Sequence, residues 1–350
     1  RWLTVTNQGQ ESAFEKYQQR FGSPWVELRP LQKTRMVRLK TLAEFRPRFE
    51  ERDRFLLLAG EEISDHFQAL PIHLNATNLR QLIHPQGGRS VAEVIQRNVD
   101  AVLEQRRRTG RAMFPHVNHP NFGWAITAED LMQVRGDRFF EVYNGHPAIH
   151  NAGDEQHASV ERQWDIVLAM RLSHLKLGPL YGLAVDDAHN YHTFARIHSN
   201  PGRGWVVVRC SRLRADSLIA AMQEGDFYAS TGVRLTDVRR GSRELSLEVE
   251  PEAGVTYTTQ FIGTLAGFDP TSVPGTRPTN SIFEVTRRYS EEIGAVLGVV
   301  TGPRASYTLQ GDELYVRAKI VSSKPKKSSS VVGETEVAWT QPLVPQASGK

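Results

Sequence analysis

Five segments of the sequence place histidine, acidic or amide side chains beside short apolar runs. They are residues 57–64, 71–75, 114–121, 141–147 and 183–192. Imidazole and carboxylate groups are the side chains that hold Mn, Fe or Zn ions in proteins. One such segment alone is better explained as a solvated strand end or a satisfied core histidine. Five of them in one chain favour a metal site.

The spacing within two segments narrows the choice of ligands. His116 and His119 are three residues apart, so in an extended chain they point to opposite faces, and only one is expected to be a ligand. Asp187 and His189 are two apart and share a face, which gives a carboxylate–imidazole pair suited to Mn, Fe or Zn.

The elements that must position these residues alternate between strands and helices. Strands are expected at 55–59, 72–76, 112–117, 139–143, 182–185 and 205–209, and helices at 90–110, 127–134, 159–177 and 215–224. Ser90 and Gly110 are the expected N-cap and C-terminal stop of the longest helix. This alternation predicts a parallel α/β sheet or barrel, with ligands at the C-terminal ends of strands.

The two ends of the chain have a different texture. Residues 1–54 are polar and are expected to be helix and loop at the start of the α/β domain. Short β-type runs follow residue 231, at 235–238, 244–249, 256–261, 305–309 and 313–320. They predict a small antiparallel sandwich over 235–321, without metal ligands because no histidine follows His198. Residues 322–350 are expected to be a linker and loose tail.

Bulk composition excludes some classes of protein. The chain has 350 residues, of which 39% are hydrophobic and 23% charged, as in soluble globular proteins, and no apolar run approaches a membrane span. A net charge of +4 fits a solvated surface better than a nucleic-acid-binding stripe. Cys210 is the only cysteine, so no intrachain disulfide forms. A soluble protein is expected, either cytoplasmic or exported after removal of a leader.

In their order, the five segments resemble the PHP (polymerase and histidinol phosphatase) superfamily over roughly residues 55–232. Residues 60–64 resemble its G-x-E-I-S segment, 118–120 its A-H-P segment, 141–145 its E-x-x-N-G strand, 187–189 its D-x-H pair and 225–232 its G-x-x-Y-x-x-x-G end. His73 follows Glu62 by eleven residues, as in phosphoesterase members. The β-rich end of the chain looks closest to the carbaryl-hydrolase-like branch.

The resemblance implies a distorted (βα)7-type barrel over 55–232, N-terminally incomplete in this chain, that binds up to three Mn, Zn or Fe ions in a complete member. The metal ligands that it implies are Glu62, His73, His119, Asp187 and His189, with Glu62 bridging two ions. The groups expected around the ions or the substrate are Asn118, Glu141, Asn144 and Asn190. His146 and His192 are candidates to protonate a leaving group.

The chain departs from the family at its start. Members open with an H-x-H pair and a D-H pair, whereas the first histidine here is His66. N-terminal truncation and degeneration both account for this, and truncation is the expectation because the loss of two strands would expose sheet edges. With those ligands absent, the chain is expected to bind at most one ion firmly and to hydrolyse poorly.

Three functions remain open. Hydrolysis of a phosphomonoester or nucleotide leads, and hydrolysis of a carbamate or carboxylic ester by the same activated water is the alternative. A non-catalytic homologue with an incomplete site is the third. The expected partner is a small-molecule ester, phosphorylated in the leading hypothesis, and not a membrane. Nucleic acid is expected only as a short substrate, since no aromatic-plus-basic stacking platform is evident. The oligomeric state is left open.

Overall fold

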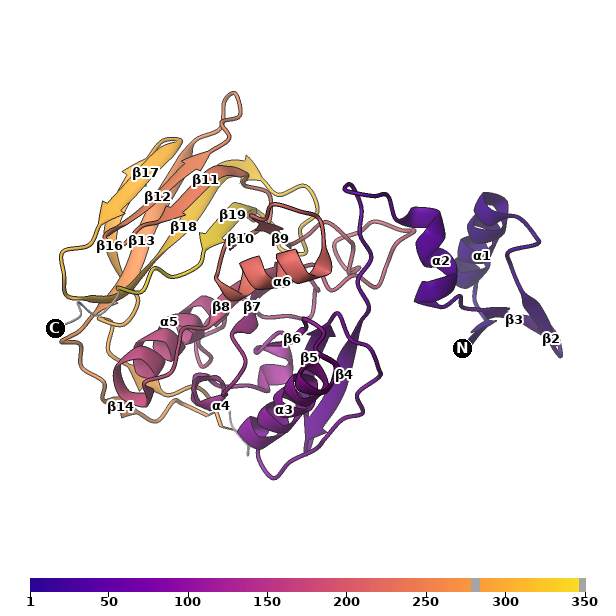
Figure 1. Cartoon of the computed structure of the whole chain (residues 1–350), viewed down its shortest axis with the longest axis horizontal. Coiled ribbons are helices and arrows are strands. Elements are labelled where there is room, and N and C mark those ends of the chain that lie inside the picture. Colours follow the sequence, from indigo (N-terminus) through magenta and orange to yellow (C-terminus); the bar gives the residue numbers. More distant parts are fainter. Residues whose placement is uncertain (278–283, 346–350) are drawn as a thin grey trace. The chain divides into compact units, whose positions relative to one another are not determined.

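The structure is a computed structural model that describes residues 1–277 and 284–345 (Figure 1). The chain divides into two compact units, Arg1–Ala59 and Gly60–Lys350. The first unit contains β1 (Trp2–Val5), α1 (Gln8–Phe21), β2 (Leu28–Leu31), β3 (Thr34–Arg38) and α2 (Leu42–Phe49). Its antiparallel strands lie in the order β1-β3-β2. Val5, Phe14, Val26 and Val37 form its core.

The second unit begins with a five-stranded mixed sheet in the order β4-β5-β6-β7-β8. Its strands are β4 (Gly60–Phe67), β5 (Leu70–Thr77), β6 (Phe114–Val117), β7 (Phe139–Asn144) and β8 (Tyr181–Val185). β4, β5 and β6 pair antiparallel, whereas β6, β7 and β8 pair parallel. One face of this sheet is apolar, because Ile72, Leu74 and Phe140 alternate with polar residues along their strands.

Helices pack on this sheet through apolar side chains. They are α3 (Val91–Thr109), α4 (Ala128–Gln133), α5 (Val160–Met170) and α6 (Ala215–Gln223), with a 3-10 turn at Phe122–Trp124 and a π-turn at Arg171–Leu175. The Ser90 side chain caps α3, and Gly110 ends it in the left-handed conformation, as predicted. In the part of the chain that the structure describes, no helix has the length and apolar character of a membrane span.

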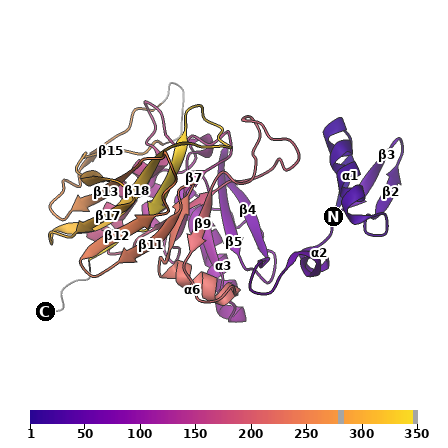
Figure 2. The ribbon, with the colours of Figure 1, turned by 90° about the horizontal axis from the view of Figure 1, so that it is seen from above.

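The remaining strands form two larger antiparallel sheets and one small one. A six-stranded sheet has the order β16-β13-β18-β19-β10-β9, a three-stranded sheet has the order β11-β12-β17, and β14 pairs with β15. The strands are β9 (Trp205–Val208), β10 (Phe227–Ser230), β11 (Leu235–Arg240), β12 (Glu244–Val249), β13 (Tyr257–Leu265), β14 (Ser272–Val273), β15 (Arg288–Tyr289), β16 (Ala295–Thr301), β17 (Arg304–Thr308), β18 (Glu313–Pro325) and β19 (Thr335–Thr340). Figure 2 shows the orange and yellow strands beside the purple ones.

The predicted (βα)7-type barrel is wrong. Strands account for 33% of the chain and helices for 22%, and the described residues form several sheets without closing a barrel. At one end of the five-stranded sheet, β4 and β5 form an antiparallel hairpin with no helix between them, which breaks the alternation of strands and helices that a barrel needs. At the other end, β9 and β10 leave the βα region and join β19 in the six-stranded sheet.

The expected domain boundaries also differ from the structure. Residues 1–59 form their own unit, and no boundary falls between 232 and 235, since β10 and β19 are neighbours in one sheet. The helix α5 contacts β7 as well as β13 and β18, and its buried Asp165 accepts two hydrogen bonds from Arg317. The supposed tail over 322–350 contains β19.

Asp137 is a buried carboxyl group at the start of β7. Its Oδ1 accepts hydrogen bonds from the backbone N–H groups of Arg138 and Phe139, at 2.6 and 3.0 Å. Its Oδ2 has no hydrogen-bond partner among the described residues. Burial raises the pKa of Asp137 to about 8. The folded protein therefore holds a protonated carboxyl group at neutral pH.

We predict that Asp137→Asn removes a pH-dependent loss of stability. Between the ordinary pKa of 3.8 and about 8, the unfolded chain ionises this group while the folded chain does not. Stability should fall across this window as pH rises, and it should level off above it. Denaturant unfolding at pH 5 and pH 8 should show the variant gaining on the wild type at the higher pH. Equal pH dependence of the two proteins would refute this account.

Candidate metal centre

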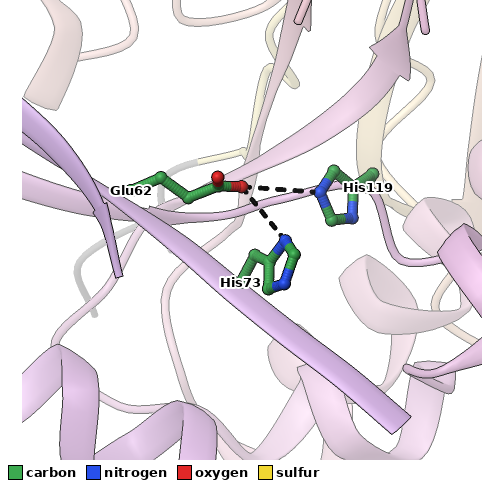
Figure 3. A group of neighbouring side chains, drawn as sticks. All are labelled: Glu62, His73 and His119. Carbon is green, nitrogen blue, oxygen red and sulfur yellow. Dashed lines mark ion pairs between the residues drawn. The ribbon is translucent and has the colours of Figure 1, made fainter. Parts of the chain in front are cut away.

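Glu62, His73 and His119 bring one ligand atom each to a common point. All three atoms lie within 4.8 Å of one another. Glu62 Oε1 lies 3.1 Å from His73 Nδ1 and 3.8 Å from His119 Nε2 (Figure 3). Ligands of one ion are separated by such distances, because each bond to the ion is about 2 Å long. They are three of the five metal ligands that the family resemblance implies.

The β4–β5 hairpin positions two of the three ligands. Ile63 is 1% exposed, and Ile72 and Leu74 are completely buried. Side chains alternate along a strand, so Glu62 and His73 must point to the opposite face. The pairs Glu62–Asn75 and Ser64–His73 then place the two ligands diagonally across the hairpin. The expectation that each ligand follows a strand end is wrong for both residues, since they lie within antiparallel strands.

His119 comes from the loop after β6, where its backbone adopts a positive φ of 21°. Such a conformation is uncommon for a residue with a side chain and needs support from its surroundings. The support is Glu141, whose Oε2 accepts a hydrogen bond from the His119 backbone N–H at 2.8 Å. Phe122 packs against the His119 ring with ring centroids 5.1 Å apart. The imidazole is therefore held in place before any ion binds.

Asn118 fixes the carboxylate of Glu62. Its Nδ2 donates to Glu62 Oε1 at 3.0 Å, while its Oδ1 accepts from the backbone N–H of Asn75 at 3.0 Å. This amide therefore ties β4 to the loop that carries His119. Asn118 was predicted to lie beside the ions or the substrate, and its observed contact is with a candidate ligand.

The three ligands perturb one another electrostatically. The imidazoles of His119 and His73 hold the pKa of Glu62 well below its usual range, against the opposing effect of burial. Burial lowers the pKa of His119. The carboxylates of Glu62, Glu141 and Asp187 raise this pKa by more than burial lowers it, so the net shift is upward. Glu62 is thus ionised at neutral pH, which is the form that binds a cation.

A cavity of about 130 Å³ opens beside these ligands. It is lined by Glu62, His73, His119, Phe122, His146, Ile149, Asp187 and His189. Asp187 and His189 therefore share the cavity with the three-residue cluster, although they are not part of it. Asp187 also has a positive φ of 48°. Its carboxylate Oδ2 lies 3.3 Å from Asn144 Nδ2.

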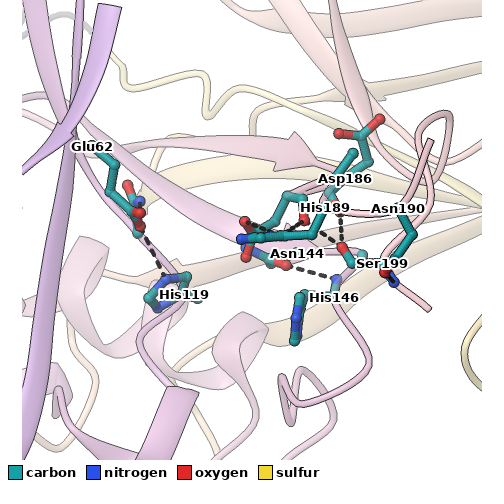
Figure 4. A network of polar contacts seen from close by, with 12 residues as sticks. Glu62, His119, Asn144, His146, Asp186, His189, Asn190 and Ser199 are labelled. Atoms are coloured by element: carbon teal, nitrogen blue, oxygen red, sulfur yellow. Dashed lines mark hydrogen bonds and ion pairs between the residues drawn. The ribbon is translucent and has the colours of Figure 1, made fainter. Parts of the chain in front are cut away.

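Asn144 connects the two sides of the cavity (Figure 4). Its Nδ2 donates to Glu141 Oε2 at 2.9 Å and reaches Asp187, while its Oδ1 accepts from the His146 backbone N–H at 2.8 Å. Glu141 is 2% exposed and binds the His119 backbone with the same oxygen. Glu141 and Asn144 thus link both sets of candidate ligands, and both were predicted to surround the site.

His146 and His189 meet edge to face with ring centroids 5.5 Å apart. His146 Nδ1 accepts from the backbone N–H of Ala148 at 3.1 Å, so its neutral ring carries the proton on Nε2. Burial lowers the pKa of His146, and although Asp187 acts in the opposite direction, the nearby His189, His119 and Arg203 add to the lowering. The His189 ring is 64% exposed, and its Nδ1 lies 2.8 Å from the carbonyl oxygen of Asp187.

Two predicted residues do not reach the cavity. His192 is exposed on the loop after β8 and is not among the cavity-lining residues, so the geometry gives it no leaving-group contact. Asn190 holds the same loop together, since its Oδ1 accepts from the backbone N–H of Ser199 at 3.0 Å. Both were chosen for their closeness in sequence to His189, and the chain turns away after that residue.

His116 has a carboxylate partner that its sequence context did not predict. Its side chain is 8% exposed, and its Nε2 lies 3.4 Å from Glu141 Oε1. His116 and His119 take different carboxylate partners, Glu141 and Glu62. Asn75 pairs with both Glu62 and His116, so His116 lies on the same sheet face as Glu62, and the expected separation of the two histidines onto opposite faces is wrong. The alternation of polar residues along β6 and β7 was the signal that could have paired His116 with Glu141. Phe122 and Ile149 left no such signal.

Comparisons with known proteins add no evidence on function. No protein-family model, curated protein or solved structure gives a significant match to the chain. The likeness to the PHP superfamily is therefore carried by the sequence motifs alone.

We predict that removing one imidazole destroys ion binding. His73→Ala and His119→Ala should each weaken Zn²⁺ or Mn²⁺ binding by at least about a hundredfold, more than the loss of a supporting contact would. Titration calorimetry on the full chain measures this, with His66→Ala as the control because His66 is exposed on the same strand as Glu62. Wild-type affinity in either ligand variant would exclude the site.

We further predict that Glu141 acts by holding its neighbours. Glu141→Gln should lower ion affinity by about tenfold, because the neutral amide supports His119 and Asn144 less well. The same titration measures the affinity, and thermal unfolding should show that the variant is folded. Unchanged affinity in a folded Glu141→Gln protein would contradict this role.

Proposed function

We propose that the chain is a metal-dependent hydrolase of PHP type in its ligand set, and in the first instance a phosphoesterase acting on a phosphomonoester or nucleotide. The observation that carries the proposal is the convergence of Glu62, His73 and His119 within 4.8 Å. Polar side chains from Asp187, His189 and His146 face the same cavity. This combination suits bond cleavage better than purely structural ion binding, which closes all positions around the ion.

The residues present fit a divalent ion. One carboxylate and two imidazoles form a ligand set that catalytic zinc sites use, and it leaves a position for water or substrate. The low pKa of Glu62 keeps its carboxylate charged, and Asn118 and Glu141 restrain the ligands from outside. Asp187 and His189 supply two further candidate donors at the same cavity.

A bound ion supplies an activated water and a positive charge that offsets the charge developing on the substrate. The protein's own groups do the rest. His146 offers an Nε2–H that can donate a hydrogen bond to a leaving-group oxygen, since its Nδ1 already accepts one from the backbone N–H of Ala148. Asn144 holds the backbone of His146 and the carboxylate of Asp187 in fixed relation. The cavity of about 130 Å³ admits a phosphoryl-sized group and leaves the remainder of the substrate outside.

The experiment is a substrate screen on the full chain with Mn²⁺ or Zn²⁺ added. We expect hydrolysis of p-nitrophenyl phosphate or a nucleoside monophosphate that needs the ion and falls at least about a hundredfold in Glu62→Gln. His174→Ala is the control, because His174 is exposed and does not line the cavity.

The screen also includes an aryl carbamate and a carboxylic ester. Cleavage of these alone, lost in Glu62→Gln, would keep the metal-dependent hydrolase and overturn the phosphoesterase assignment. Absence of any metal-dependent hydrolysis, or full activity in Glu62→Gln, would overturn the proposal as a whole.

A further inference from the structure

A second and larger cavity lies elsewhere in the second unit, between the edges of two sheets. Its volume is about 770 Å³, which is within the usual range for small-molecule sites. β9 is the outer strand of the six-stranded sheet and β11 the outer strand of the three-stranded sheet, and both line the cavity. None of its lining residues belongs to the candidate metal centre.

The floor of this cavity is apolar. Tyr181 and Phe227 contribute aromatic rings that pack against each other with centroids 6.0 Å apart, and Leu343 also lines the cavity. Tyr181 and Phe227 are each 5% exposed, so their positions are fixed by packing, and Val207, which is 38% exposed, extends the apolar wall. A surface of this kind gains free energy by covering a flat or branched apolar group.

The rim of the cavity is cationic. Arg209, Arg239 and Arg240 line it together with the two carboxylates Asp226 and Asp237, which leaves one positive charge in excess. Asp237 is shared, because Arg209 and Arg239 both donate to it. Arg240 contacts Asp226 and the carbonyl oxygen of Glu224. A guanidinium group has five N–H donors, so each arginine keeps donors beyond its present contact.

We infer that this cavity binds an apolar small molecule that carries a single carboxylate. The apolar wall takes the body of the ligand, and the spare donors of Arg209 and Arg239 take its charge. Guanidinium groups bind carboxylates with paired, charge-assisted hydrogen bonds. One excess positive charge matches a monoanion. This site is separate from the proposed hydrolytic centre and does not depend on it.

The test is titration calorimetry on the full chain with 2-naphthoate, compared with the neutral 2-naphthamide. A chelator is present throughout, so that no ion at Glu62 can hold the carboxylate. We expect 2-naphthoate to bind at least about tenfold more tightly than 2-naphthamide, and Arg239→Gln to remove most of that difference. Arg107→Gln should change nothing, because Arg107 pairs with Glu104 on α3 and does not line this cavity.

Asp237→Asn should change the affinity for 2-naphthoate in the opposite direction to Arg239→Gln. It frees the two arginines that share this carboxylate and removes a like charge from the rim, so 2-naphthoate should bind more tightly. General damage to the cavity would weaken binding in both Asp237→Asn and Arg239→Gln. Equal binding of 2-naphthamide, no binding of 2-naphthoate, or weaker binding in Asp237→Asn would each overturn the inference.

Discussion

The candidate centre depends on the antiparallel pairing of β4 with β5. This pairing buries Ile63, Ile72 and Leu74 on one face and leaves Glu62 and His73 on the other. A shift of register by one residue would reverse both faces, so the apolar core itself fixes where the two ligands point. The function that we propose is therefore tied to the stability of a hairpin, with no dependence on a closed barrel.

The third ligand is held by polar contacts in a buried environment. Glu141 accepts hydrogen bonds from the His119 backbone and from Asn144, and it faces His116. Burial raises the pKa of Glu141, but His116, His119 and Asn144 together outweigh burial and lower it. A buried carboxylate with several partners is rigid, since losing any one partner leaves a costly unpaired group. The rigidity extends through Asn144 to Asp187 and so across the whole cavity.

Local signals in the sequence predicted much of the βα region. The caps at Ser90 and Gly110 defined α3, and Thr127 with Asp130 defined the start of α4. The position of β4 was predicted wrongly because the strand was placed on the apolar run 55–59. The strand that pairs with β5 begins at Gly60, and its buried residues alternate with exposed polar ones. Pairing, and not apolar content, decides where an edge strand lies.

The arrangement of the antiparallel sheets could not be predicted from local sequence patterns. β10 pairs with β19 although more than a hundred residues separate them, and no local pattern encodes such a contact. The family resemblance implied Glu62, His73 and His119 among five metal ligands, and the structure brings these three side chains together. The sequence could not separate His146, which lines the cavity, from His192, which does not, since both lie close in sequence to other candidate residues.

The central claim is that one ion is held by two imidazoles and one carboxylate. X-ray absorption on the full chain loaded with one equivalent of Zn²⁺ measures this coordination directly. The account predicts two imidazole nitrogens and one or more oxygens at about 2.0–2.2 Å, with one imidazole lost in His119→Ala. A spectrum with no imidazole scattering, or one that His119→Ala leaves unchanged, would contradict it.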